Sequence, residues 1–183
     1  SVNDSKILEI PPARCDYFSQ SSKIDILNKL NLRIEQSYLI YLPTHRDEGK
    51  SINAITKNLK MIDKILDEFN GKYKVLFKPH FYDIPNFEKN FCNYKNILFD
   101  SNWNSDELML VSSLLIGDYS GVVFDYYYLN KYEIGLCTDH DSYTKKHRDL
   151  YFKIEHIYPN LAKNEDELRE LLINFRENKL MKT

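Results

Sequence analysis

The sequence predicts an α/β fold in which helices cover both faces of one parallel sheet. Three observations support this prediction. Short apolar runs alternate with amphipathic helical patterns along the 183 residues. That length suits one domain with a substantial core, whereas two full domains would be cramped. No internal repeat or low-complexity linker interrupts the alternation, which favours right-handed crossovers between parallel strands.

The N-terminal part contains two predicted strands and a helix between them. Residues 6–10 form a short apolar run, which predicts the first strand. Residues 22–30 carry apolar side chains on one helical face, and Ser21 or Ser22 can cap this helix. Residues 38–42 are continuously apolar, as expected for a strand that is covered on both faces.

The helical pattern is clearest over residues 52–69. Apolar side chains recur there at steps of three and four residues: Ile52, Ile55, Leu59, Ile62, Leu66 and Phe69. Gly71 stands where a C-terminal cap is expected. Two further strands are predicted at residues 73–77 and 96–99.

The remaining elements continue the alternation. Acidic residues in the first turn suit a short helix over residues 105–111. A buried strand over 114–117 leads into a helix over 120–129, and a last strand covers 133–136. Asn164 and the acids after it resemble a capping box, which predicts a C-terminal helix.

Ligands of parallel sheets bind beyond the carboxyl ends of the strands. This rule selects four loops, at residues 43–49, 78–82, 100–106 and 117–121. The last is the most informative. It is a strand-to-helix turn, Gly117-Asp118-Tyr119-Ser120-Gly121, that can bind an anion through free backbone N–H groups. Gly would allow close approach of a ligand, although Ser120 could merely cap the helix and Asp118 merely turn the chain.

Basic residues follow two other strands. Lys78 offers a point charge for phosphate, and His80 offers a hydrogen bond or a proton near neutral pH, although a lone histidine there is often structural. Thr44 and Arg46 repeat the pattern, because a guanidinium can bind phosphate with two parallel hydrogen bonds. Three such loops on one edge favour a site for a phosphorylated ligand.

Two acids of the 100–106 loop region allow two interpretations. Asp106 and Glu107 could bind a ribose hydroxyl or a cationic partner, or they could simply be acids in the first turn of a helix.

Composition excludes several classes of function. The net charge of −2 gives no basic field for nucleic acid. Three widely spaced cysteines fit a reducing compartment better than a disulfide framework, and no residue set predicts a metal site. The longest apolar runs are too short for a membrane span, and no signal peptide is visible. The sequence also lacks GxxxxGKS/T, GxGxxG and GxSxG motifs.

Several segments resemble the CDP-glycerol:poly(glycerophosphate) glycerophosphotransferase family, whose members polymerise teichoic acid and some capsules. YLIYLPTHRD at 38–47 resembles the family's ILYAPTFRD, and KPH at 78–80 resembles K-x-H-P. Residues 105–126, SDELMLVSSLLIGDYSGVVFDY, are close to NELLLISDLLITDYSSVIFDY, with LNK following. RDLYF at 148–152 resembles RGFYF, and PARCD at 12–16 resembles G-x-PR-x-D. The similarity covers residues 8–175 in the family's order.

The resemblance implies that residues 1–183 are a single donor-binding domain. It would be the Rossmann-like, C-terminal half of a GT-B transferase involved in teichoic acid or capsule synthesis. In that case the donor is CDP-glycerol, His80 is a catalytic residue and no cofactor is required. Residues implied to bind the donor, together with those selected above, are Thr44, Arg46, Lys78, His80, Asp106, Glu107, Asp118, Tyr119, Ser120 and Gly121.

The resemblance also implies partners that the chain itself does not contain. The polymer acceptor would bind through an N-terminal half that has no counterpart here. We expect a cytoplasmic protein, with peripheral association at the inner face of the plasma membrane as in related proteins. The family's second serine is Gly121 and the proline after its histidine is Phe81, so specificity can differ. A capsule glycosyltransferase that uses CMP-, UDP- or GDP-sugars, or a non-catalytic nucleotide-binding module, therefore remains an alternative.

Overall fold

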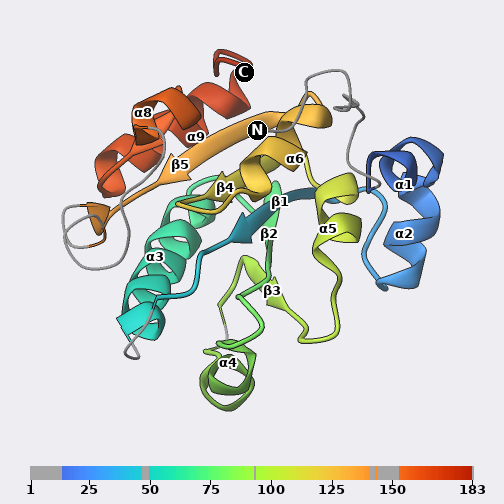
Figure 1. Ribbon diagram of the computed structural model, residues 1–183, viewed down its shortest axis with the longest axis horizontal. Coiled ribbons are helices and arrows are strands. Elements are labelled where there is room, and N and C mark those ends of the chain that lie inside the picture. The colour runs from blue at the N-terminus through green and yellow to red at the C-terminus, as the bar shows by residue number, and fades with distance from the viewer. Residues whose placement is uncertain (1–13, 47–49, 93, 141–142, 144–152, 183) are drawn as a thin grey trace, which may run out of the picture.

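The computed structural model describes residues 14–46, 50–92, 94–140, 143 and 153–182. Six parallel strands form one sheet in the order β3-β2-β1-β4-β5-β6. The strands are β1 (Ser37–Leu42), β2 (Tyr73–Phe77), β3 (Ile97–Phe99), β4 (Leu114–Gly117), β5 (Tyr132–Leu136) and β6 (Leu161–Ala162). The predicted fold class is thereby confirmed (Figure 1).

Helices cover both faces of this sheet (Figure 1). One face packs against α3 (Lys50–Asp67), α4 (Ile84–Asn90) and α9 (Glu165–Arg176). The other packs against α1 (Arg14–Gln20), α2 (Lys23–Lys29), α5 (Ser105–Val111), α6 (Val122–Tyr128) and α8 (Ile154–Ile157). Each face buries its own apolar core, as expected for a sheet whose strands are apolar on both sides.

The strand order creates a switch point between β1 and β4. From β1 the chain moves outward to β2 and β3, then returns to the other side of β1 as β4, β5 and β6. The loops after β1 and β4 therefore diverge to opposite faces and leave a crevice between them. In the strand register, Leu42 at the end of β1 pairs with Gly117 at the end of β4, so the two loops leave the sheet at neighbouring positions on its carboxyl edge.

Close packing between β4, β5 and the α8 region depends on two glycines. A Cβ at Gly117 would lie 2.5 Å from the hydroxyl oxygen of Tyr158, and a Cβ at Gly135 would lie 2.6 Å from the same ring. The buried Tyr158 side chain therefore fits against the sheet only because these strand positions lack side chains. This packing fixes where the 117–121 turn leaves the sheet.

Most predicted elements are present near their predicted bounds. Asn164 accepts a hydrogen bond from the Glu167 N–H at 3.0 Å, which confirms it as the N-cap residue of α9, while the Glu167 carboxylate accepts from the Lys163 N–H at 2.7 Å. Gly71 has a φ of +74°, the left-handed conformation expected after α3. The predicted strand at 6–10 and the RDLYF segment at 148–152 lie outside the described residues.

Among the residues that the structure describes, the sequence prediction shifted the start of one helix near the site and missed four short elements. The helix after β4 begins at Val122 with Gly121 at its N-cap position, whereas the prediction began it at Ser120. Prediction missed α1, α4, α8 and β6. These elements bury few side chains (only Phe87 in α4 and Ile154 in α8), so their apolar periodicity is too weak to identify.

Candidate functional site

All four selected loop regions meet at the carboxyl edge of the sheet, next to the switch point. They surround a pocket of about 240 Å³ at the carboxyl edge of the sheet. Its walls are Leu42, Pro43, Lys78, Pro79, His80, Phe81, Ser105, Ser120 and Val122. The turn at 117–121 thus lies beside the Lys78-Pro79-His80 segment, although the two are distant in the sequence.

Lys78 and Ser120 supply complementary polar groups to this pocket. The Lys78 ammonium donates a hydrogen bond to the Ser101 carbonyl at 3.0 Å, which restrains its side chain. Partial burial lowers the pKa of Lys78. The Ser120 hydroxyl accepts a hydrogen bond from the Val122 N–H at 3.3 Å, so it caps the first turn of α6 from one position before the N-cap residue.

His80 is oriented by its own loop. Its Nδ1 accepts a hydrogen bond from the Tyr82 N–H at 3.4 Å, so the neutral ring carries its proton on Nε2. Burial, reinforced by the nearby His45 ring, lowers the pKa of His80 below its ordinary value of 6.5. Near neutral pH the ring is therefore an uncharged donor that is available to an anion in the pocket.

His45 and Asp83 form a pair behind His80 that the sequence prediction did not identify. The His45 Nδ1 lies 3.0 Å from both carboxylate oxygens of Asp83, which is 2% exposed. The rings of His45 and His80 stack with centroids 5.5 Å apart. The carboxylate thus holds His45 in place, and His45 supports the ring of His80. Asp83 precedes α4, an unpredicted helix, so its position gave no signal in the sequence.

Arg46, which the sequence analysis selected as a phosphate ligand, is bonded to carboxylates of the protein. Its guanidinium is buried in ion pairs with Asp118 at 2.8 Å and Asp139 at 2.7 Å, and the whole residue is 3% exposed. Burial alone would lower the pKa of Arg46, but Asp118 and Asp139 raise it well above its ordinary range. The Arg46 guanidinium thus donates to Asp118, Asp139 and the Thr44 carbonyl, and Arg46 is not among the residues that line the pocket.

The other polar residues of this network are also bonded internally. Asp118 accepts hydrogen bonds from the Thr44 N–H at 2.9 Å and the Thr44 hydroxyl at 2.5 Å. The Tyr119 hydroxyl donates to Asp139 at 3.0 Å, and the Tyr119 ring stacks on Tyr143. Thr44, Asp118 and Tyr119 thus shape the loops after β1 and β4 and do not line the pocket. Asp139, which joins them, follows β5, a strand end that the prediction did not select.

The acids of α5 point away from the pocket. The Glu107 carboxylate is buried and accepts hydrogen bonds from Lys29 and from the Tyr17 hydroxyl, on the α1–α2 side. The backbone N–H of Asp106 donates a hydrogen bond to the side chain of the N-cap residue Asn104 at 2.7 Å. Both acids lie in the first turn of α5, which confirms the first-turn interpretation, and neither is among the residues that line the pocket.

Lys131, in the LNK motif, has a structural role that explains its place after α6. Its ammonium donates hydrogen bonds to the carbonyl oxygens of Met109, Leu110 and Ser112 at 2.6–2.8 Å. These carbonyls stand at the end of α5, where helical partners are missing. Lys131 thereby fixes α5, and with it the Ser105 wall of the pocket.

Within the described part of the chain, no group of three or more His, Cys, Asp or Glu side chains could hold a metal ion. Among those same residues, no helix is long and apolar enough to cross a membrane.

Comparison with a protein-family model identifies the chain. Residues 1–182 match the model of CDP-glycerol:poly(glycerophosphate) glycerophosphotransferase. The chain belongs to this family. The assignment agrees with the motif resemblance, and the residues that carry that resemblance include the pocket segments at 78–80 and 117–121.

Curated relatives of this glycerophosphotransferase-family chain are teichoic acid enzymes. A teichoic acid poly(glycerol phosphate) polymerase of Staphylococcus epidermidis is 34% identical over 159 residues, which are 82% of this chain and 22% of the relative. A teichoic acid glycerol-phosphate transferase of Staphylococcus aureus is 26% identical over 93% of this chain and 46% of the relative. The chain therefore spans less than half the length of these relatives.

Solved structures show the same relationship. The wall teichoic acid polymerase TagF aligns over 97% of this chain and 45% of its own, with 29% identity and a TM-score of 0.72. A TagF variant soaked with CDPG gives 30% identity and a TM-score of 0.74 over 44% of its chain. A UDP-GlcNAc 2-epimerase of Methanocaldococcus jannaschii, at 17% identity and a TM-score of 0.59, shares the fold alone.

Proposed function

We propose that this chain is the donor-binding part of a transferase that uses CDP-glycerol to build wall teichoic acid. The supporting observation is the pocket where Lys78, His80 and Ser120 meet at the switch point of the sheet. An ammonium, an imidazole N–H and a serine hydroxyl suit the diphosphate of such a donor. Family membership and the CDPG soak of a TagF variant favour this donor.

The size of the pocket indicates which part of the donor it holds. At about 240 Å³ it is smaller than the ~300–1,000 Å³ that usually enclose a whole small ligand. We therefore assign the diphosphate to this pocket and expect the nucleoside and the glycerol to extend beyond it.

The proposed chemistry is phosphoryl transfer. An acceptor hydroxyl attacks the β-phosphorus, a new P–O bond forms, and the P–O bond to CMP breaks. We place the base that takes the hydroxyl proton, and the binding site of the reacting end of the acceptor, in the part of the protein that the relatives have and this chain does not span. Lys78 and the Nε2–H of His80 stabilise the charge that develops on the leaving CMP, so this chain contributes positioning and electrostatics. We propose that the transfer reaction requires no cofactor.

Isothermal titration of the 183-residue chain tests this function. CDP-glycerol and CDP should bind with a dissociation constant below about 1 mM, since a few charge-assisted hydrogen bonds supply the ~4 kcal/mol that this affinity requires. UDP-glucose is the matched control and should bind more weakly. No detectable binding of either cytidine nucleotide at millimolar concentration would overturn the proposal, and tighter binding of the UDP-sugar would favour the glycosyltransferase alternative.

Restoring the family's serine should improve this site. Gly121 has φ −64° and ψ −8°, a conformation open to any residue, and a Cβ there would meet no atom within 4 Å. We expect Gly121→Ser to raise the free energy of unfolding by about 0.4–1 kcal/mol, because glycine leaves more freedom in the unfolded chain. The added hydroxyl, beside Ser120, should also tighten CDP-glycerol binding.

Gly121→Ala is the matched control for this change. It should match the stability gain of the serine variant in urea titrations without improving the dissociation constant. Equal CDP-glycerol affinity of the two variants would show that the restored hydroxyl does not reach the ligand.

A further inference from the structure

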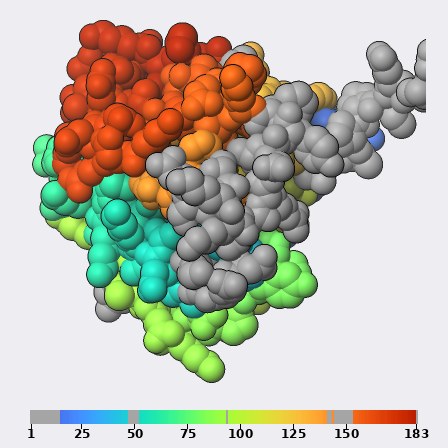
Figure 2. Space-filling view, turned by 60° about the vertical axis from the view of Figure 1, so that its left-hand side comes forward, coloured from blue at the N-terminus to red at the C-terminus, as the bar shows by residue number. Residues whose placement is uncertain are grey.

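A second, larger concavity lies between α3 and the segment that joins β6 to α9. Its volume is about 630 Å³. The lining residues are Asn53, Thr56, Lys57, Lys60, Met61, Lys64, Thr138, Lys163, Asn164 and Glu165. Figure 2 shows the two walls side by side on the surface, with teal α3 beneath the orange-red segment of α8 and α9. None of these residues belongs to the diphosphate pocket.

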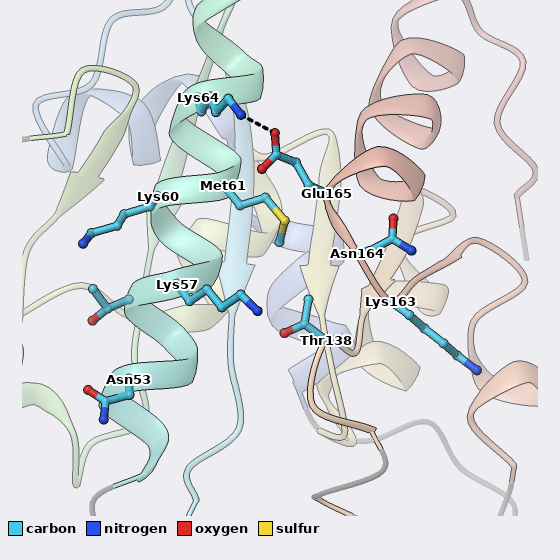
Figure 3. A pocket seen from close by; sticks show the side chains of 10 residues that line it. Asn53, Lys57, Lys60, Met61, Lys64, Thr138, Lys163, Asn164 and Glu165 are labelled. Carbon is cyan, nitrogen blue, oxygen red and sulfur yellow. Dashed lines mark hydrogen bonds and ion pairs between the residues drawn. The ribbon is translucent and has the colours of Figure 1, made fainter.

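The lining is strongly basic for a chain whose net charge is −2, because it contains four lysines and one glutamate. Lys57 and Lys60 are exposed, and neither forms an ion pair with the residues that the structure describes. Lys64 pairs with Glu165 at 2.6 Å (Figure 3). Lys163 pairs with Glu155 at 3.5 Å. The Lys57 side chain points across the concavity toward Thr138 (Figure 3). Two of the four lysines, Lys57 and Lys60, are thus available to an anionic ligand.

The lysines of α3 are spaced along the helix. Lys57, Lys60 and Lys64 lie three and four residues apart, so they are spread over about 10 Å of α3 at 1.5 Å per residue. Lys57 and Lys64 point toward the α9 side, whereas Lys60 extends away from it (Figure 3). A single phosphate would engage one end of this row. A ligand with several phosphates at regular spacing would engage more of it, which favours a chain of phosphodiesters.

Neutral hydrogen-bonding groups accompany the lysines. Asn53 and Thr56 offer an amide and a hydroxyl, whereas Thr138 and Asn164 are bonded to Asn58 and Glu167 and the apolar Met61 is buried. Hydroxyl groups between phosphates would find partners here. A membrane surface is less suited, because lipid-binding faces combine cations with exposed large apolar side chains, and the one large apolar side chain among the lining residues, Met61, is buried.

The concavity opens at the same edge of the sheet as the diphosphate pocket. Thr138 follows β5, and its hydroxyl donates to the buried Asn58 of α3 at 2.9 Å. The next residue, Asp139, holds Arg46 and accepts a hydrogen bond from Tyr119 in the turn after β4. Thr138 therefore lines the concavity, and its neighbour Asp139 belongs to the network that supports the loops after β1 and β4.

We propose that this concavity binds the phosphodiester backbone of the polymer acceptor, close to the donor. The lysines bind the phosphates, and the Asn53 and Thr56 side chains bind the hydroxyls of the alditol units. The inference rests on the proposed function, because only a transferase of this kind needs a polyanionic acceptor beside its donor. Such a site would hold the growing chain between additions while its free end remains at the diphosphate pocket.

The test compares two double variants that change the net charge equally. Lys57→Gln with Lys163→Gln removes one lysine from each wall, and Lys23→Gln with Lys89→Gln removes two exposed lysines elsewhere. The probe is a synthetic trimer of glycerol phosphate, titrated into the 183-residue chain by calorimetry at low ionic strength. The wall variant should lose about tenfold in affinity for the trimer, as expected for two exposed charge pairs, and the control should lose little.

Two further measurements separate the possible outcomes. CDP-glycerol binding should be unchanged in the wall variant, which verifies its fold and keeps donor binding distinct from polymer binding. Failure of the unmodified chain to bind the trimer, or equal losses in both variants, would overturn this inference while donor binding could still hold. Binding to phosphatidylglycerol vesicles that depends on the same two lysines and exceeds trimer binding would also overturn it, in favour of a membrane contact.

Discussion

Replacing Asp118 with alanine is expected to lower the free energy of unfolding by about 3–5 kcal/mol, because it removes one partner from a buried ion pair. Arg46 is 3% exposed and Asp118 1% exposed, so the guanidinium would keep its charge in the interior with Asp139 as its remaining carboxylate. Thr44 would also lose the acceptor of its N–H and hydroxyl groups. Urea titration followed by circular dichroism measures the change.

The control for this prediction is Asp166→Ala on α9. That carboxylate forms an exposed ion pair with Arg169, so its removal should change stability little. If Asp118→Ala were no more destabilising than Asp166→Ala, the buried network would not support the loops after β1 and β4.

The same network has a defined dependence on pH. Burial by itself would raise the pKa of Asp139, but the hydrogen bond and charge of Arg46 outweigh burial, so the pKa is lowered from 3.8. A carboxylate with a lowered pKa stabilises the fold fully above its ordinary value, and this contribution disappears as the pH falls through the lowered value. The network should therefore persist at pH 4 and weaken in stronger acid, and Asp139→Asn should remove that part of the acid dependence.

Replacing His80 with alanine should weaken CDP-glycerol binding about ten- to hundredfold. One hydrogen bond to a charged group contributes roughly 1.5–3 kcal/mol, and the Nε2–H of His80 faces the pocket that we assign to the diphosphate. His80→Gln, which retains an N–H donor, should recover part of the lost affinity. Calorimetry on the two variants measures both effects, and unchanged affinity in His80→Ala would remove this residue from the site.

Binding should also tighten as the pH falls in a way that depends on His80. The lowered pKa keeps the free ring neutral near pH 7, and protonation adds a positive charge beside the diphosphate. Affinity for CDP-glycerol should therefore rise as the pH falls below 6.5 through the lowered pKa. CDP-glycerol is the suitable probe, because its diphosphate is esterified at both ends and keeps its charge over this range.

Two variants identify which histidine is responsible. His80→Gln should bind CDP-glycerol with little dependence on pH between 5 and 7. His45→Phe removes the neighbouring ring that helps to lower the pKa of His80, so the rise in affinity should begin at a higher pH. A pH dependence that survives His80→Gln and disappears in His45→Phe would transfer the proposed role to His45.

The sequence determined the architecture because the signals involved are local. Alternating apolar runs and helical periodicity placed the strands and the longer helices, and the rule for parallel sheets selected the loops that contain Lys78, His80 and Ser120. These residues lie within one pocket, as predicted. Residue type together with position at a strand end was enough to find them.

The tertiary structure alone decided which charged residues face a ligand. Arg46 and His80 both follow strands and look alike as phosphate ligands in the sequence. Only the folded chain brings Asp118 and Asp139 onto Arg46 and leaves the pocket to His80. Contacts between residues 72 to 93 positions apart cannot be read from local spacing, because the crossovers of the sheet determine them. For the same physical reason the basic concavity between α3 and α9 became visible only once the chain was folded.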